Sequence, residues 1–205
     1  MKRFAGIIIV FTVLSLSSCA SDPKATGYTE DYYDDAFSSH IPAGQKVAKI
    51  LTGDFRGYGE TQAFIITVDE NLDPDKYWDI DYGFMGIGIY YMDGDKLVVV
   101  DERNEEGSVN AETGRVDSYD ADVLIIQCLM DGYAADRNCD GLVYIVKDGE
   151  PVLAGRVDGY PAFADGYIVG THMRARAEGG VEIQNTTYDI VGYSLVEISQ
   201  EVSAE

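Results

Sequence analysis

Residues 123–171 read VLIIQCLMDGYAADRNCDGLVYIVKDGEPVLAGRVDGYPAFADGYIVGT, a series of short apolar runs separated by Asp-Gly steps. Both residues of an Asp-Gly step tolerate positive φ, which a two-residue hairpin turn requires. Five of the six Asp-Gly steps of the chain fall between residues 131 and 166, seven to ten residues apart. This spacing predicts an antiparallel meander.

Strand-like composition extends to both sides of this stretch. Runs rich in Ile, Val, Phe and Tyr predict further strands at 47–51, 63–68, 87–91, 97–100, 167–171, 173–177, 181–184 and 190–198. Gly179-Gly180 is expected to form a hairpin turn, and no segment keeps apolar residues at helical spacing for three turns. We therefore expect a mainly β domain of about ten to twelve short strands over residues 45–205.

The first residues have the pattern of an export signal. Lys2 and Arg3 precede thirteen uncharged, mostly apolar residues, 4–16, a stretch too short to cross about 30 Å of hydrocarbon comfortably. Leu16-Ser17-Ser18-Cys19 resembles the lipobox of bacterial lipoproteins. The resemblance implies a signal peptide at 1–18, cleavage before Cys19, and lipid on that cysteine. An ordinary secretory signal or an N-terminal transmembrane helix is the alternative.

Lipid on Cys19 would place the chain at the cell membrane or outer membrane, facing outside the cytoplasm. Two or more acyl chains hold a protein stably at a bilayer, whereas one does so only marginally. Residues 20–44 contain five acidic residues together with Pro and Gly, and show no helical or alternating period. We expect residues 19–44 to form the lipidated cysteine and an acidic tether to the domain.

The charge of the chain limits its partners. Without Lys2 and Arg3 the chain has 13 basic and 36 acidic residues, a net charge of −23. Such a surface repels phosphate backbones, so nucleic acid is not an expected partner. The acidity serves solubility or, where carboxylates converge, the binding of a divalent cation.

Residues 50–64, ILTGDFRGYGETQAF, resemble an FG-GAP or VCBS-type repeat, and residues 88–97 resemble the hairpin that completes such a blade. These repeats form β-propeller blades in integrins and bacterial surface proteins, and their loop aspartates usually hold calcium. Here Arg56 and Tyr58 stand at ligand positions, so calcium in this loop is disfavoured, while Gly53, Gly57 and Gly59 keep the turn.

The resemblance implies a propeller-like or partial-propeller domain. Ten to twelve strands are too few for six four-stranded blades. Either a partial propeller self-associates, or the blade motif is reused in a smaller β fold, which is the expectation we favour.

A second acidic loop contains Asp136, Asn138 and Asp140, which with Gly141 fit the pattern D-x-N-x-D-G. Alternate oxygen ligands before a glycine are typical of a calcium loop, although Lys147 at the twelfth position excludes an EF-hand. Calcium is therefore the candidate cofactor. An acidic hairpin turn without metal is the alternative.

Cys128 and Cys139 remain in a chain that leaves the cytoplasm, where an even cysteine count favours a disulfide. An antiparallel hairpin folded about residues 132–135 would place the two cysteines opposite each other. Such a disulfide would contribute about 3 kcal/mol in the chain-entropy model. Two half-buried free thiols are the alternative.

Tyr77, Trp78, Asp79 and Asp81 form the preferred candidate for a binding surface. The two aspartates alternate and would share one face of a strand, where like charges need a cation or solvent between them. A solvated loop is the alternative.

Catalysis has little support in the sequence. Its two histidines are His40 and His172, and it has no Gly-x-Ser-x-Gly elbow, His-Glu-x-x-His helix or phosphate-binding glycine loop. We expect a membrane-anchored, surface-exposed, non-catalytic binding module for a protein or glycan. A carboxylate-based hydrolase of the cell envelope and a structural subunit of an envelope complex are the alternatives.

Overall fold

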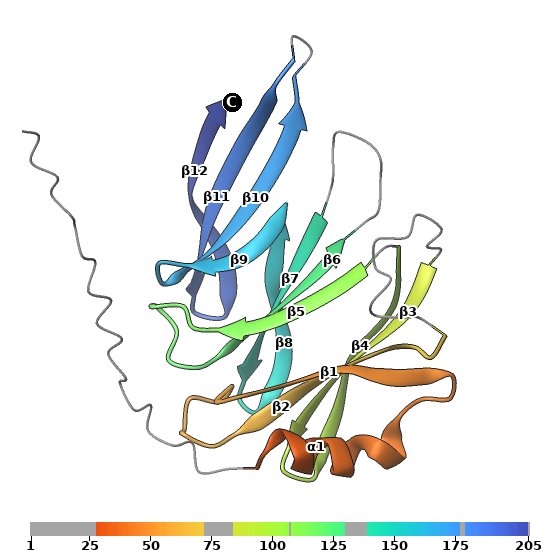
Figure 1. Cartoon of the computed structure of the whole chain (residues 1–205). Coiled ribbons are helices and arrows are strands. Elements are labelled where there is room, and N and C mark those ends of the chain that lie inside the picture. Colours follow the sequence, from red (N-terminus) through yellow and green to blue (C-terminus); the bar gives the residue numbers. More distant parts are fainter. Residues whose placement is uncertain (1–27, 72–83, 107, 130–138, 177–178, 205) are drawn as a thin grey trace, which may run out of the picture.

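The computed structural model describes residues 28–71, 84–106, 108–129, 139–176 and 179–204 (Figure 1). The described residues form twelve strands in three four-stranded sheets, preceded by helix α1 (Glu30–Phe37) and a single turn of 3-10 helix, η1 (Ser38–His40). All strand pairs are antiparallel, and each sheet is a meander of four consecutive strands. The predicted mainly β fold of about ten to twelve strands is confirmed. The described residues form neither a closed barrel nor a closed propeller.

The first sheet has the strand order β1-β2-β3-β4. Its strands are β1 (Gln45–Gly53), β2 (Gln62–Asp69), β3 (Phe84–Asp93) and β4 (Lys96–Glu106). The second sheet has the order β5-β6-β7-β8. Its strands are β5 (Ser108–Gly114), β6 (Val123–Leu129), β7 (Cys139–Lys147) and β8 (Glu150–Asp158).

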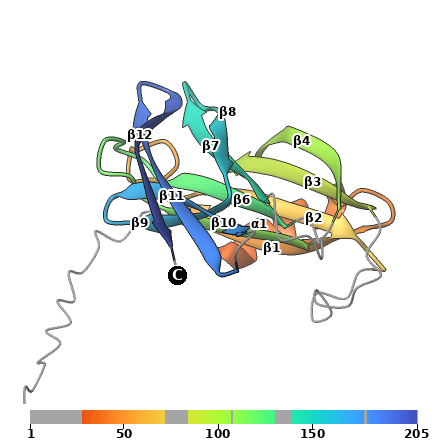
Figure 2. The same cartoon turned by 90° about the horizontal axis from the view of Figure 1, so that it is seen from above.

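The third sheet has the order β12-β11-β10-β9. Its strands are β9 (Tyr160–Ala164), β10 (Tyr167–Ala175), β11 (Val181–Val191) and β12 (Ser194–Ala204). Figure 1 shows α1 beside the first sheet, the second sheet in the middle and the third sheet farthest from α1, and Figure 2 shows the same arrangement from above.

The second sheet is the central layer of the stack, and both of its faces are buried. Leu124 and Leu142 pack in the cluster shared with the first sheet, whereas Ile125 and Val143 pack in the cluster shared with the third. Successive side chains of a strand point to opposite faces, so a layer buried on both sides needs an unbroken apolar run. The apolar runs at the start of β6 and the end of β7 meet this requirement.

Two Asp-Gly steps form the expected hairpin turns. Asp148 and Gly149 have φ of 53° and 80° between β7 and β8, and Asp165 and Gly166 have φ of 50° and 79° between β9 and β10. Positive φ at both central residues is the requirement of the type I′ turn, whose twist matches that of the paired strands.

Two other Asp-Gly steps do not form hairpins, so the prediction is wrong there. Gly159 (φ 86°) follows β8 and carries the chain from the second sheet to the third. Gly141 lies inside β7, where an added Cβ would stand 2.5 Å from Cγ of Pro161. The glycine at 141 therefore serves the close packing of two sheets rather than a turn.

The strand pattern differs from expectation in three places. The run 190–198 is not one strand, because Gly192 (φ 67°) ends β11 and the chain turns into β12. The two strands expected at 167–171 and 173–177 are one strand, β10. Strand β5 was not expected because its sequence, SVNAETG, is mostly polar.

Helix α1 corrects the expectation that all of residues 19–44 are an irregular tether. Tyr33 and Phe37, one helical turn apart, are completely buried against the outer face of the first sheet. The Thr29 hydroxyl caps the helix by accepting a hydrogen bond from the backbone N–H of Tyr32 (3.3 Å). A helix of eight residues has only two turns and cannot show a three-turn period. The tether expected before Tyr28 lies outside the described residues.

In the part of the chain that the structure describes, no helix has the length and apolarity needed to cross a membrane.

Candidate functional site

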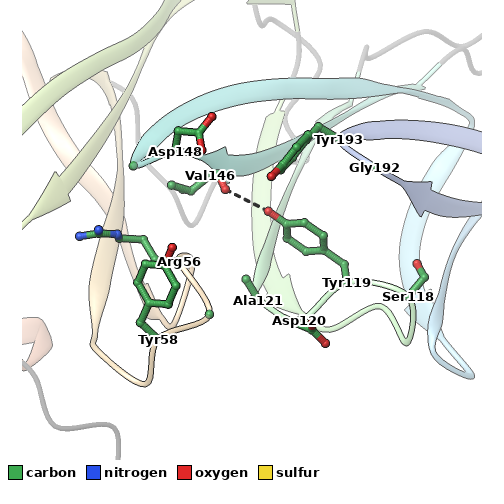
Figure 3. A pocket seen from close by; sticks show the side chains of 12 residues that line it. Arg56, Tyr58, Ser118, Tyr119, Asp120, Ala121, Val146, Asp148, Gly192 and Tyr193 are labelled. Carbon is green, nitrogen blue, oxygen red and sulfur yellow. Dashed lines mark hydrogen bonds between the residues drawn. The ribbon is translucent and has the colours of Figure 1, made fainter.

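A hollow of about 430 Å³ lies along one edge of the stack, where loops from all three sheets converge (Figure 3). Its walls come from the β1–β2 loop, the β5–β6 connection, the β7–β8 turn and the β11–β12 turn. Tyr58, Tyr119 and Tyr193 line it from three of these segments. Its size is that of a typical small-molecule site, and we call it the tyrosine pocket.

The β1–β2 loop is shaped by its own aspartate. The Asp54 carboxylate accepts hydrogen bonds from the backbone N–H groups of Tyr58 (3.0 Å) and Gly59 (2.9 Å). Gly57 and Gly59 adopt φ of 72° and 79°, so the prediction that they keep the turn is confirmed, whereas Gly53, which was expected there too, ends strand β1. The resulting loop presents the ring of Tyr58, 74% exposed, at the rim of the pocket.

The β5–β6 connection is bonded to the β1–β2 loop through two carboxylates and one arginine. The Asp122 carboxylate accepts a hydrogen bond from the backbone N–H of Asp54 (2.6 Å), and the backbone N–H of Asp122 donates to the Asp54 carbonyl (2.9 Å). Nε of Arg115 donates to Asp122 (2.8 Å), and its Nη2 lies 3.8 Å from the Asp54 carboxylate. Arg115 therefore supplies positive charge where the two carboxylates meet. Among the described residues, no three or more His, Cys, Asp or Glu side chains are grouped as a metal site requires.

Tyr119 forms a fixed wall of the pocket. Its hydroxyl donates to the Val146 carbonyl (3.0 Å), the bond drawn in Figure 3. Burial raises the pKa of the Tyr119 phenol, so the group stays a neutral donor at physiological pH. This hydrogen bond links the β5–β6 connection to the end of β7 and so fixes two of the converging segments relative to each other.

The other two tyrosine rings are exposed and lie on opposite sides of the hollow (Figure 3). The Arg56 guanidinium lies 5.2 Å from the ring centre of Tyr58, and Nζ of Lys147 lies 4.6 Å from that of Tyr193. Arg56 is itself held by a 2.7 Å ion pair with Asp93. Cations over aromatic faces orient the rings and leave their remaining surfaces available to a ligand.

The lining also contains polar side chains that can bind a ligand. Asp120 and Asp148 add carboxylates and Ser118 adds a hydroxyl, and the described residues of the lining include no histidine, cysteine or lysine. His172 lies far from these loops in β10, 5% exposed, with Nδ1 3.8 Å from the carboxylate of Asp158. The pocket can therefore hold and orient a ligand.

Most residues proposed from the sequence fall outside the described part of the chain. They are the lipidation site Cys19, the surface residues Tyr77, Trp78, Asp79 and Asp81, and the calcium-loop residues Asp136 and Asn138. Asp140 lies in β7, opposite Cys128 in β6 and Asp158 in β8. The tyrosine pocket is a different site from each of these proposals.

The register of β6 and β7 differs from the one expected for a disulfide. Cys139 is opposite Leu129, and Cys128 is opposite Asp140, so the two cysteines are one position out of direct opposition. The expected direct pairing of Cys128 with Cys139 is therefore wrong, because β6 and β7 pair in a register shifted by one residue. The disulfide itself stays a prediction.

Sequence reasoning missed the tyrosine pocket. Tyr58 stands between two glycines and Tyr193 follows one, so both rings belong to turns that cannot bury them. A tyrosine next to turn glycines is the sequence pattern that could have indicated these two exposed rings. Tyr119 carries no such signal, because its role depends on a carbonyl 27 residues away in the sequence.

The chain matches no protein-family model, and searches of curated proteins and of solved structures found no match either.

Proposed function

We propose that this chain is a lipid-anchored, surface-exposed lipoprotein whose β domain binds a glycan without catalysis in the tyrosine pocket. The convergence of two exposed tyrosine rings on a hollow of about 430 Å³ is the observation that carries the proposal. The lipobox-like segment ending at Cys19 supports the anchor, and the exposed faces of Tyr58 and Tyr193 support ligand binding.

A glycan fits the chemistry of the lining better than other ligand classes. Tyrosine rings offer flat apolar faces to the C–H face of a sugar ring and keep a hydroxyl at the wet edge. Asp120 and Asp148 can accept hydrogen bonds from sugar hydroxyls. A formal net charge of −21 repels anionic ligands, so the expected glycan is neutral.

The anchor would hold one end of the stack close to the bilayer. Nine residues lead from Cys19 to Tyr28, and even fully extended they span only about 30 Å. Because α1 begins two residues after Tyr28, the α1 end of the domain would stay within that distance of the lipid. A ligand on the surface of the same or a neighbouring cell is then within reach.

We also propose that the blade motif is reused here in a smaller β fold, made of three propeller-like meanders. Consecutive four-stranded antiparallel meanders that pack face to face support this assignment. The blade-like sequence at 50–64 provides the end of β1, the β1–β2 loop and the first residues of β2 in the first meander.

Glycan-array screening of the purified full chain in detergent, followed by calorimetry on the best ligand, tests the binding. Tyr58→Ala and Tyr193→Ala should each weaken it about tenfold, the loss expected for a recognition aromatic. Tyr28→Ala, which removes an exposed tyrosine beside α1, is the matched control and should leave the affinity unchanged. Unchanged affinity in both pocket variants would refute the site, and binding of a protein but no glycan would refute the ligand class.

The anchor is tested separately. Cys19→Ser should abolish incorporation of labelled palmitate and release the chain from the membrane fraction. A Cys19→Ser chain that is still labelled and membrane-bound would contradict the lipid anchor but not the binding proposal.

A further inference from the structure

The two ends of the sheet stack are closed differently. Helix α1 covers the outer face of the first sheet and buries Tyr33 and Phe37 there. The third sheet packs one face on the second sheet through Ile168 and Ile190. An added Cβ on Gly155 of β8 would stand 2.6 Å from Leu195, which shows how closely β12 approaches the second sheet. The opposite face of the third sheet has no counterpart to α1 among the described residues.

This outer face carries apolar side chains. The registers Val169↔Thr187 and Met173↔Ile183 place these residues on the face opposite the buried pair Ile168↔Tyr188. Met173 is 47% exposed, and Val181 and Val196 on the neighbouring strands are also exposed. A sheet face left in water normally carries polar residues, yet the outward positions of β11 hold Val181, Ile183 and Val191 beside the polar Asn185, Thr187 and Asp189.

Charge is scarce on the same face although the chain is strongly acidic. The chain holds 36 Asp and Glu residues against 15 Lys and Arg. The registers place only Asp189 and Glu201 among the described outward positions of β9 to β12. The Asp189 carboxylate accepts a hydrogen bond from the hydroxyl of Ser118. Two copies of so acidic a chain repel each other, and a face with only these two carboxylates at its described outward positions adds little to that repulsion.

The area of the face suits a dimer. Four strands about 4.8 Å apart and about nine residues long, at 3.4 Å per residue, cover roughly 600 Å². Two such faces together bury about 1,200 Å², the lower limit for a specific interface. The same alignment of apolar sheet faces already joins the first sheet to the second and the second to the third.

We propose that the outer face of the third sheet binds the same face of a second copy of this chain. Identical patches then meet about a two-fold axis, as in an isologous dimer. Because α1 closes the other end of each stack, association stops at two copies and does not continue into a fibre.

Sedimentation equilibrium of the purified full chain tests the dimer. The measurement uses a density-matched detergent with micelles in large excess, so that two chains do not share a micelle by chance. The wild-type chain should sediment as a dimer, and Met173→Asp or Val196→Asp should raise the dissociation constant at least tenfold. Val99→Asp is the matched control, because Val99 is an exposed valine (57%) in β4 of the first sheet. Since all three side chains are already exposed, each variant should fold, and circular dichroism verifies that it does.

A wild-type chain that stays monomeric up to about 100 µM would overturn the proposal, whether another segment or a different protein covers the face. A dimer that persists in both face variants would overturn it too, because pairing along the free edge of β12 would then carry the contact. Assemblies larger than two would overturn the closure by α1.

Discussion

Replacing Phe37 with alanine tests whether α1 belongs to the folded domain. Phe37 is completely buried, and its ring centre lies 4.9 Å from that of Tyr90 in β3. Truncating a buried phenylalanine to alanine costs about 3–5 kcal/mol, because apolar contacts are lost and a cavity remains. Typical domains have a free energy of unfolding of about 5–15 kcal/mol, so the loss is a large fraction of the total.

The assay is urea or thermal unfolding of the purified full chain followed by circular dichroism. For a chain of 150–250 residues each kcal/mol lowers Tm by roughly 2–4 °C, so Phe37→Ala should lower Tm by about 6–20 °C. Asp34→Ala is the control, because Asp34 lies on the exposed side of the same helix and its removal should change the free energy of unfolding by about 0.5 kcal/mol or less. A loss below about 1 kcal/mol in Phe37→Ala would refute the packing of α1 on the sheet and restore the tether interpretation.

Three further predictions follow from particular contacts. Gly141→Ala should destabilise the chain by about 1–3 kcal/mol in urea unfolding, because its methyl group would overlap Pro161 of the third sheet; a neutral result would contradict the close approach. Burial opposes ionisation of the Asp101 carboxyl group, but hydrogen bonds from Arg103 and Tyr144 outweigh burial and hold the pKa of Asp101 below the usual 3.8. The contribution of Asp101 to stability is therefore complete above about pH 3.8 and disappears as pH falls through the folded-state pKa. The difference in free energy of unfolding between wild type and Asp101→Asn should therefore shrink on acidification, and a constant difference from pH 6 to pH 2 would be inconsistent with this coupling. If the loop 136–140 binds calcium, melting with calcium at 100 times its dissociation constant should show about 2.7 kcal/mol more stability than melting with chelator, and Asp136→Ala should remove the gain.

The strands of the second sheet were predictable because a layer buried on both faces leaves an unbroken apolar run. The residues VLII of β6 and LVYIV of β7 show this directly. The hairpin turns at 148–149 and 165–166 were predictable for an equally local reason, since positive φ at both turn positions selects Asp and Gly.

Other features were hidden because their cause is distant in the chain. The polar strand β5 exists because it pairs with β6, and no apolar run announces it. Gly141 and Gly159 have the same sequence signature as the turn glycines, yet one meets Pro161 and the other the backbone of Thr171. A pattern of neighbouring residues cannot distinguish a glycine needed for a turn from one needed for close approach.

The tyrosine pocket shows the same limit. Its walls come from four segments between residues 56 and 193, and only the stacking of the sheets brings them together. Arg115 meets the carboxylates of Asp54 and Asp122 for that reason too, which the motif at 50–64 could not indicate.

The order of apolar runs and turn residues is local information, and it was sufficient for the mainly β class, most of the strands and the lipobox-like segment at Cys19. How the sheets stack, which face of each is covered and where the loops meet depend on contacts between residues far apart in the chain. The packing of complementary side chains determines these contacts, and only the folded chain displays it. The covered end at α1 and the open face at Met173 and Val196 both follow from that packing.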